Sequence, residues 1–239
     1  DDTDTDTDTD VEPTVAFSGQ VIYDDGTVAT GNVRVQMCDE NLCRVAMPDA
    51  SGNFTYEALP LKSYAFDVVP LATDNPFETY ATPLDIYTLD SDAEPVTLDA
   101  PVYVYTFTNR GELTDDTFDA GDGLIIDVDD ADIERTFEEP DADYVASVIV
   151  DPTQAGLPLQ DITGDIVGMW FLGPFKAKVG WTFRLEDTGL AEGTTLRAYN
   201  SYYDGIEWVD LGQLTVDADG DATGTAEIQH LSTIVVVQE

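Results

Sequence analysis

The sequence predicts an all-β protein made of two β-sandwich domains behind a short acidic tether. Runs of alternating apolar and polar residues recur at intervals of about eight to twelve residues, as is typical of small sandwiches. Turn signals such as Asp25-Gly26 and Asp219-Gly220 separate these runs. No stretch has a convincing helical period. Together, these observations favour strands joined by tight turns over any helical architecture.

The charge of the chain limits its partners. Among 239 residues, 49 are acidic and 9 are basic, for a net charge of −40, while 43% are hydrophobic and can form a core. Such a surface repels nucleic acid and anionic membranes, so neither is predicted as a partner. Salt or divalent cations would screen the self-repulsion, which fits a saline or calcium-containing exterior. No window approaches about 18 apolar residues, so no membrane-spanning segment is expected.

Residues 1–12 are Asp-Thr repeats without an apolar side chain before Val11. A segment that cannot bury apolar surface is predicted to be disordered. Its composition suggests a tether that holds the folded part off a surface, with a lipid anchor upstream of Asp1. A solvated tail is the alternative. The tether points to an extracellular, outer-surface or periplasmic location.

Cys38 and Cys43 flank a four-residue loop between two strand-like runs. Directly opposed residues of an antiparallel pair lie at disulfide distance, so a disulfide is predicted. Closing this small ring stabilises the fold by about 2 kcal/mol in the chain-entropy model. A disulfide also implies an oxidising compartment. Two buried free thiols are the alternative.

The first domain is expected over residues 13–107 and the second over residues 108–239. The boundary lies near Thr108, where Asn109-Arg110-Gly111 interrupts the alternation. Each run offers one face to a core. The residues expected on the inner face of the first domain are Phe17, Val21, Tyr23, Val33, Val35, Met37, Val45, Met47, Phe54, Tyr56, Tyr64, Phe66 and Val68.

Residues 15–70 resemble the carboxypeptidase-regulatory, transthyretin-like sandwich module. The resemblance rests on the Asp25-Gly26 turn, the Gly31–Val35 run GNVRV, the Ala50–Phe54 turn ASGNF and a closing strand with Tyr64. It implies an accessory, non-catalytic module of secreted proteins. The cysteine pair is not part of the common pattern of that family.

The second half continues the strand pattern with Leu124, Ile126 and Val128 on one face of a run. Residues 181–237 resemble the sandwich domain shared by ankyrins, netrin receptors and tight-junction scaffolds, which bacterial surface proteins also use. The Trp208–Gly212 strand WVDLG and a terminal strand that starts at His230 carry this resemblance. It implies a structural or interaction module.

The trio His230, Leu231 and Ser232 resembles the cleavage motif of autoproteolytic sandwich domains. By that resemblance, Ser232 would attack the Leu231 carbonyl after activation by His230. The alternative is that His230 packs at a strand end and Ser232 forms local hydrogen bonds.

Acidic loops suggest calcium as the one cofactor to consider. Calcium prefers several closely spaced carboxylate and carbonyl oxygens, with a glycine at the sharp turn. Asp115, Asp116, Asp119 and Asp122 supply such a set beside Gly121, although clusters of this kind are expected in so acidic a chain.

Tyr199, Tyr202, Tyr203 and Trp208 suggest a platform on which a sugar could stack, with core packing as the alternative for Trp208. The single histidine excludes a multi-histidine metal site, and no phosphate loop, nucleophile elbow or zinc helix is present. The sequence therefore predicts a non-enzymatic structural or adhesion module that contacts a protein or glycan at a cell surface. Carbohydrate- or calcium-dependent ligand binding and self-cleavage are the alternative functions.

Overall fold

The computed structural model describes residues 13–71, 76–90, 94–114 and 116–239. The predicted tether over residues 1–12 lies outside this range. The described chain is almost entirely β, and its one helix is α1 (Pro76–Thr79). The predicted all-β class is therefore confirmed. No helix of these residues is long and apolar enough to cross a membrane.

The first unit, residues 13–107, contains two four-stranded sheets. In one sheet β1 lies between β4 and β7 and also pairs with β8; the other has the order β3-β2-β5-β6. Its strands are β1 (Thr14–Tyr23), β2 (Val33–Cys38), β3 (Cys43–Ala46), β4 (Asn53–Pro60), β5 (Ser63–Pro70), β6 (Leu84–Thr88), β7 (Val96–Thr97) and β8 (Val102–Val104).

Alternation places large aromatic side chains between these two sheets. Phe17 from β1 lies 6.2 Å from Phe54 and 5.6 Å from Phe66, measured between ring centroids. All three side chains are buried. A buried aromatic ring removes a large apolar area from water, and edge-to-face pairs add to this stabilisation.

The prediction was wrong for Val45 and Met47, which are each 51% exposed. In the β2–β3 hairpin, Val35 pairs with Ala46 and Gln36 pairs with Val45. Residues directly opposed across a strand pair share a face, so Ala46 lies on the core side with Val35. Val45 therefore lies on the outer face of an edge strand.

The second unit, residues 108–239, forms one twelve-stranded sheet that curls around its own core, so its layers are continuous rather than separate. Its strands are β9 (Asn109–Glu112), β10 (Thr117–Asp119), β11 (Leu124–Asp127), β12 (Ile133–Glu134), β13 (Tyr144–Ile149), β14 (Asp165–Gly173), β15 (Lys178–Leu185), β16 (Thr195–Tyr202), β17 (Glu207–Val216), β18 (Ala222–Gly224), β19 (Glu227–His230) and β20 (Thr233–Gln238).

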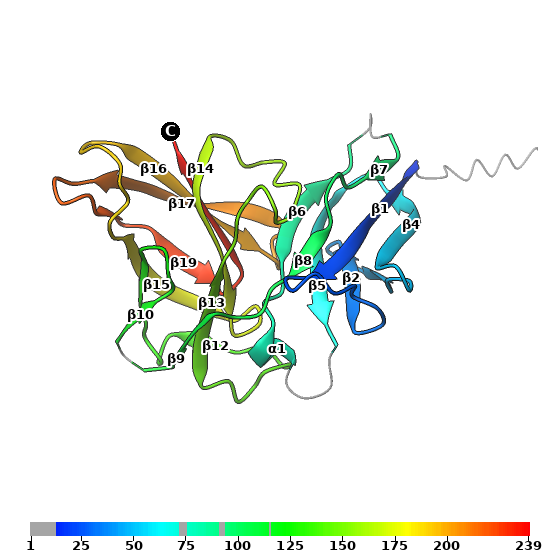
Figure 1. Cartoon of the computed structure of the whole chain (residues 1–239), viewed down its shortest axis with the longest axis horizontal. Coiled ribbons are helices and arrows are strands. Elements are labelled where there is room, and N and C mark those ends of the chain that lie inside the picture. The colour runs from blue at the N-terminus through cyan, green and yellow to red at the C-terminus, as the bar shows by residue number, and fades with distance from the viewer. Residues whose placement is uncertain (1–12, 72–75, 91–93, 115) are drawn as a thin grey trace, which may run out of the picture.

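Strand β20 up to Val237 and strand β14 from Gly168 onward are buried on both faces. Trp170 and Ile234 point into the core of the second unit, whereas Phe171 and Val235 belong to the hydrophobic cluster of the first unit. The two units lie side by side (Figure 1) and share apolar packing along this surface. This double burial explains why the Ile234–Val237 stretch is continuously apolar.

The chain passes from one sheet to another between β8 and β9. Strand β8 pairs with β1, whereas β9 pairs with β13. The predicted boundary at residues 107–108 lies between these strands. Apolar packing continues across this boundary, and the division into two domains stays a prediction.

The second unit also covers the outer face of the sheet β3-β2-β5-β6. Tyr203, Ile206 and Trp208 pack against buried residues of that face, which include Ala65 and Ile86. Asp67 and Asp85 are fully buried. Two carboxyl groups are thus enclosed between the units.

Candidate functional site

A cleft of about 520 Å³ lies where the β2–β5 face of the first unit meets two loops of the second unit. The loop between β14 and β15 supplies Phe175 and Lys176, and the loop after β16 supplies Tyr203 and Asp204. A third segment, which runs on from β12, supplies residues 134–138. The cleft therefore combines segments that are far apart in the sequence.

The base of the cleft is organised by a buried ion pair between Lys176 and Asp67. The Lys176 ammonium also lies 3.5 Å from the centre of the Tyr203 ring, a cation–π contact. Burial raises the pKa of Asp67, while Lys176 and Arg34 act in the opposite direction. This pair joins β5 of the first unit to the second unit.

Gln36 extends this network. With its amide oriented so that both ends are satisfied, Gln36 donates to Asp67 Oδ1 at 3.2 Å. Its carbonyl oxygen accepts from Arg34 Nε at 2.6 Å and from a terminal nitrogen of Arg34 at 3.2 Å. The Arg34 guanidinium is thereby oriented by a neutral acceptor.

The cleft concentrates positive charge in an acidic protein. Four of the 9 basic residues line it: Arg34, Arg135, Lys176 and Lys178. Its acidic lining residues are Glu134, Glu138 and Asp204, and Asp204 forms an ion pair with Lys178 at 2.6 Å. The cleft is consequently far less acidic than the chain as a whole.

A second buried carboxyl, that of Asp85, also joins the two units. Asp85 accepts hydrogen bonds from the backbone N–H of Ile86 at 2.7 Å, the N–H of Leu159 at 2.9 Å and Trp208 Nε1 at 3.2 Å. Burial raises the pKa of Asp85 to about 7, although these hydrogen bonds lower it. Trp208 is therefore half-buried against the first unit rather than part of an exposed platform.

The predicted tyrosine platform is divided among different surroundings. Tyr199 packs against the shared hydrophobic cluster, and the Tyr202 ring lies 4.2 Å from the His230 ring. Tyr203 alone of the three lines the cleft. The residues share a strand and its following turn, but alternation and the turn point their side chains in different directions.

The trio at the end of β19 is buried. The Ser232 hydroxyl donates to the Ser201 carbonyl at 2.7 Å and accepts from Asn200 Nδ2 at 2.9 Å. His230 Nδ1 has no hydrogen-bond partner among the described residues, and burial lowers the pKa of His230 to about 4. Leu231 is fully buried in the second core. The Ser232 backbone N–H donates to the His230 carbonyl at 3.0 Å, whereas the Ser232 hydroxyl is hydrogen-bonded to Ser201 and Asn200 rather than to the His230 ring. Self-cleavage stays a prediction.

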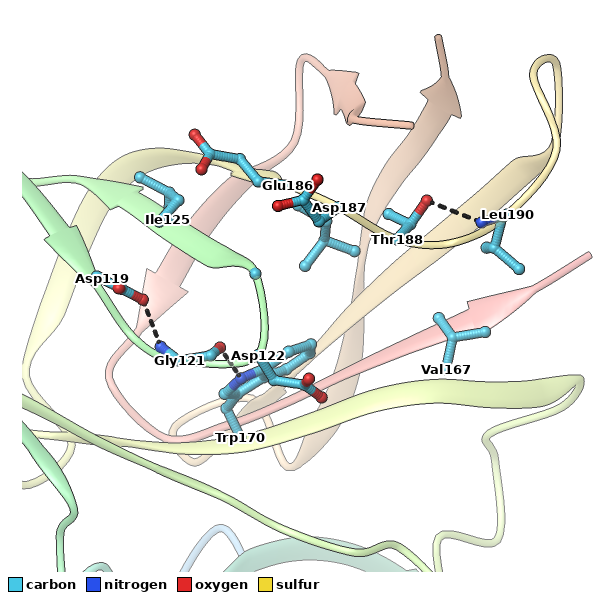
Figure 2. A pocket seen from close by; sticks show the side chains of 12 residues that line it. Asp119, Gly121, Asp122, Ile125, Val167, Trp170, Glu186, Asp187, Thr188 and Leu190 are labelled. Atoms are coloured by element: carbon cyan, nitrogen blue, oxygen red, sulfur yellow. Dashed lines mark hydrogen bonds between the residues drawn. The ribbon is translucent and has the colours of Figure 1, made fainter. Parts of the chain in front are cut away.

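Asp119 and Asp122 of the proposed calcium set border a different cavity, of about 400 Å³, beside Leu185 at the end of β15 (Figure 2). The cleft includes Lys178 at the start of β15, so this cavity lies at the far end of the second unit. Asp119 and Asp122 line it together with Glu186 and Asp187. Figure 2 shows these carboxylates spread around the pocket, with Asp119 accepting from the Gly121 N–H at 2.9 Å. In the part of the chain that the structure describes, no group of three acidic, histidine or cysteine side chains is close enough to hold a metal ion.

Of the remaining two members of the calcium set, the structure describes only Asp116. Asp116 accepts from the Thr117 N–H and is not among the lining residues. Asp115 lies outside the described residues. Calcium binding therefore stays a prediction.

Cys38 and Cys43 form a disulfide with an S–S distance of 2.07 Å. The pair closes the β2–β3 hairpin, where the two residues are directly opposed. The Tyr203 hydroxyl lies 3.2 Å from Cys43 Sγ, so the disulfide also contacts the cleft.

Sequence reasoning missed most of the cleft. Arg34, Arg135 and Lys176 come from three distant segments, and no local pattern connects them. One signal was available: Phe137 stands alone in the polar stretch 134–141. Its side chain is 87% exposed.

Comparisons with known proteins assign no family. No protein-family model matches the sequence. No curated protein matches it either.

Solved structures give only distant likenesses. A DUF3823 family protein from Parabacteroides merdae has 10% identity and a TM-score of 0.27 over 95% of this chain and 99% of its own. A second DUF3823 family protein, from Bacteroides ovatus, has 12% identity and a TM-score of 0.28 over 91% and 81%. A proposed carbohydrate binding protein from Bacteroides uniformis has 6% identity and a TM-score of 0.26 over 95% and 80%. At these scores the likenesses assign neither a family nor a function.

Proposed function

We propose that this chain is a non-enzymatic adhesion module that acts outside the cytoplasm and binds a glycan in the cleft between its two units. The observation that carries the proposal is Phe137. It borders the cleft with 87% of its side chain exposed, the largest exposure among the large hydrophobic residues described. An exposed aromatic ring beside a polar cavity is a characteristic surface for stacking on a sugar ring.

The chemistry of the cleft suits a hydroxyl-rich ligand. Its volume of about 520 Å³ is within the ordinary range of small-ligand sites, about 300–1,000 Å³. Tyr203, Thr136 and the charged residues supply polar groups, while Phe137 and Phe175 supply apolar surface. A sugar presents both hydroxyl groups and apolar C–H faces to such a site.

Two observations support the compartment and the absence of turnover in this proposal. The Cys38–Cys43 disulfide favours an oxidising environment. The buried ionisable groups Asp67 and Asp85 are used in contacts that join the two units, through Lys176 and Trp208. Neither carboxyl is among the residues that line the cleft, so both support the packing of the two units rather than proton transfer to a ligand there.

A glycan array probed with the purified chain and its Phe137→Ala variant tests the proposal. The variant is expected to lose binding about tenfold or more, since stacked aromatic contacts in desolvated sites contribute strongly. Met47→Ala is the matched control, because Met47 is an exposed hydrophobic residue that does not line the cleft.

Equal binding by all three proteins would place the ligand elsewhere. No binding to any glycan would contradict the function. Release of reducing ends from a bound glycan would show turnover and overturn the non-enzymatic assignment.

A further inference from the structure

Ion pairing divides the basic residues into two groups. Within the described residues, every basic side chain except Arg34 and Arg135 has a carboxylate oxygen within 4.0 Å. The paired residues are Arg44, Lys62, Arg110, Lys176, Lys178, Arg184 and Arg197. Both exceptions line the cleft.

The lack of an ion pair at Arg34 and Arg135 among the described residues is unexpected for a chain of this composition. The chain has 49 acidic residues for 9 basic ones, so a surface arginine has many carboxylates available to it. Arg34 and Arg135 instead contact neutral oxygens: Arg34 contacts Gln36, and Arg135 Nε donates to the Ala142 carbonyl at 2.6 Å. A guanidinium has five N–H donors, and these contacts leave most of them available.

Resting on the glycan-binding function proposed above, we infer that the cleft binds an acidic sugar and that Arg34 and Arg135 bind its carboxylate. Guanidinium groups match the geometry of a carboxylate, and the charge-assisted hydrogen bonds between them are stronger than neutral ones. The neutral contacts of the two arginines hold them in place without neutralising them, so the site is organised before the ligand arrives.

The acidic lining of the cleft favours a sugar over a simple anion. Glu134 and Glu138 border the same cavity and would repel a bare anion. Both are hydrogen-bond acceptors, which sugar hydroxyl groups can satisfy. Phe137 offers an apolar face to the same ring. One acidic monosaccharide unit carries all three complementary features.

The test compares matched ligands by calorimetry. Oligomers of galacturonate, glucuronate and mannuronate are each titrated beside the same oligomer with its carboxylates methyl-esterified. A buffer of about 1 M NaCl with a chelator shortens the screening length to about 3 Å and reduces repulsion from the protein's net charge. N-acetylaspartate serves as a carboxylate that is not a sugar.

At least one free acid is expected to bind about tenfold or more tightly than its ester. Arg135→Ala and Arg34→Ala are expected to remove that preference. Arg184→Ala, which removes an arginine paired with Asp127 and Glu186, is expected to preserve it. Melting temperatures identify a variant that fails to fold, and Arg135→Ala is the cleaner variant because Arg34 also influences Asp67.

The outcomes separate the two proposals. Ester binding that equals or exceeds acid binding, and that is lost in Phe137→Ala, would overturn the acidic-sugar inference and leave glycan binding intact. No binding by either form, or by any neutral glycan, would overturn the proposed function itself. Binding of N-acetylaspartate as tight as that of the best free acid would assign the cleft to carboxylates in general and overturn the sugar.

Discussion

Carboxyl groups lie in opposite surroundings at the boundary between the two units and at the far end of the second unit. At the boundary, Asp67 and Asp85 are fully buried and each has partners from the other side. At the far end, Asp122 and Asp187 border an open pocket, and neither makes an ion pair among the described residues (Figure 2).

This difference shows which charged residues can indicate a functional site in a very acidic protein. Carboxylates gathered at a solvated surface are expected from composition alone. Burial of a carboxyl group has a desolvation cost, so buried carboxyl groups are found with hydrogen-bond or ionic partners. Arginines without an ion pair, such as Arg34 and Arg135 among the described residues, are unexpected where carboxylates are so abundant. We therefore expect the functional site at the boundary between the units, and this expectation can be tested by mutation.

The largest effect is expected for Lys176→Met. It leaves Asp67 buried without its cationic partner, which costs about 3–5 kcal/mol of the free energy of unfolding. Lys178→Met is the matched control, because it removes the same charge from an exposed pair with Asp204 and is expected to cost about 0–1 kcal/mol. Urea denaturation measures both. Equal losses would show that the buried pair has no special role in joining the units.

The second effect is a pH dependence of stability that belongs to Asp85. Its pKa is raised from 3.8 to about 7 in the folded protein, so the native state binds more protons than the unfolded state between those values. The free energy of unfolding therefore falls as the pH rises from about 4 to about 7, by at most about 4 kcal/mol.

Comparison of the wild type with Asp85→Asn isolates this contribution from other groups. His230 gives the opposite slope, because its pKa is lowered from 6.5 to about 4 and its stabilisation is lost as the pH falls through that range. The difference in unfolding free energy between wild type and variant is expected to shift in favour of the variant as the pH rises. A constant difference from pH 4 to 7 would contradict the raised pKa.

A smaller effect is expected from the disulfide beside the cleft. Replacing Cys38 and Cys43 together by alanine removes a short covalent loop and lowers the free energy of unfolding by about 2 kcal/mol. Reduced wild-type protein is expected to match the double variant in urea denaturation. Since Tyr203 contacts Cys43, the variant also reports on whether the cleft needs this support.

The smallest effect is expected at the far end. If its carboxylates are only solvated, calcium and magnesium at equal ionic strength raise the melting temperature equally by screening. The combined Asp119→Asn and Asp122→Asn variant is expected to respond to the two ions in the same way. A calcium-specific increase in melting temperature that this variant loses would establish a calcium site at these carboxylates.

The strand pattern and turn chemistry determined much of the fold. Period-two alternation correctly predicted Phe17, Val35 and Phe66 as core, and two opposed cysteines predicted the hairpin disulfide. These features depend on near neighbours in the chain, which is why they can be read locally. The outward direction of the Val45 side chain was not predicted, because it depends on how β2 and β3 pair across the hairpin.

The sequence by itself therefore determined the strands, the turns and the excess of negative charge. Only the tertiary structure decided which charged groups leave water. Asp67 alternates outward from its own sheet, and it is buried because the second unit covers that face. Arg34, Arg135 and Lys176 converge for the same reason. Local alternation specifies one face of a strand, whereas packing between distant segments decides what covers the other face.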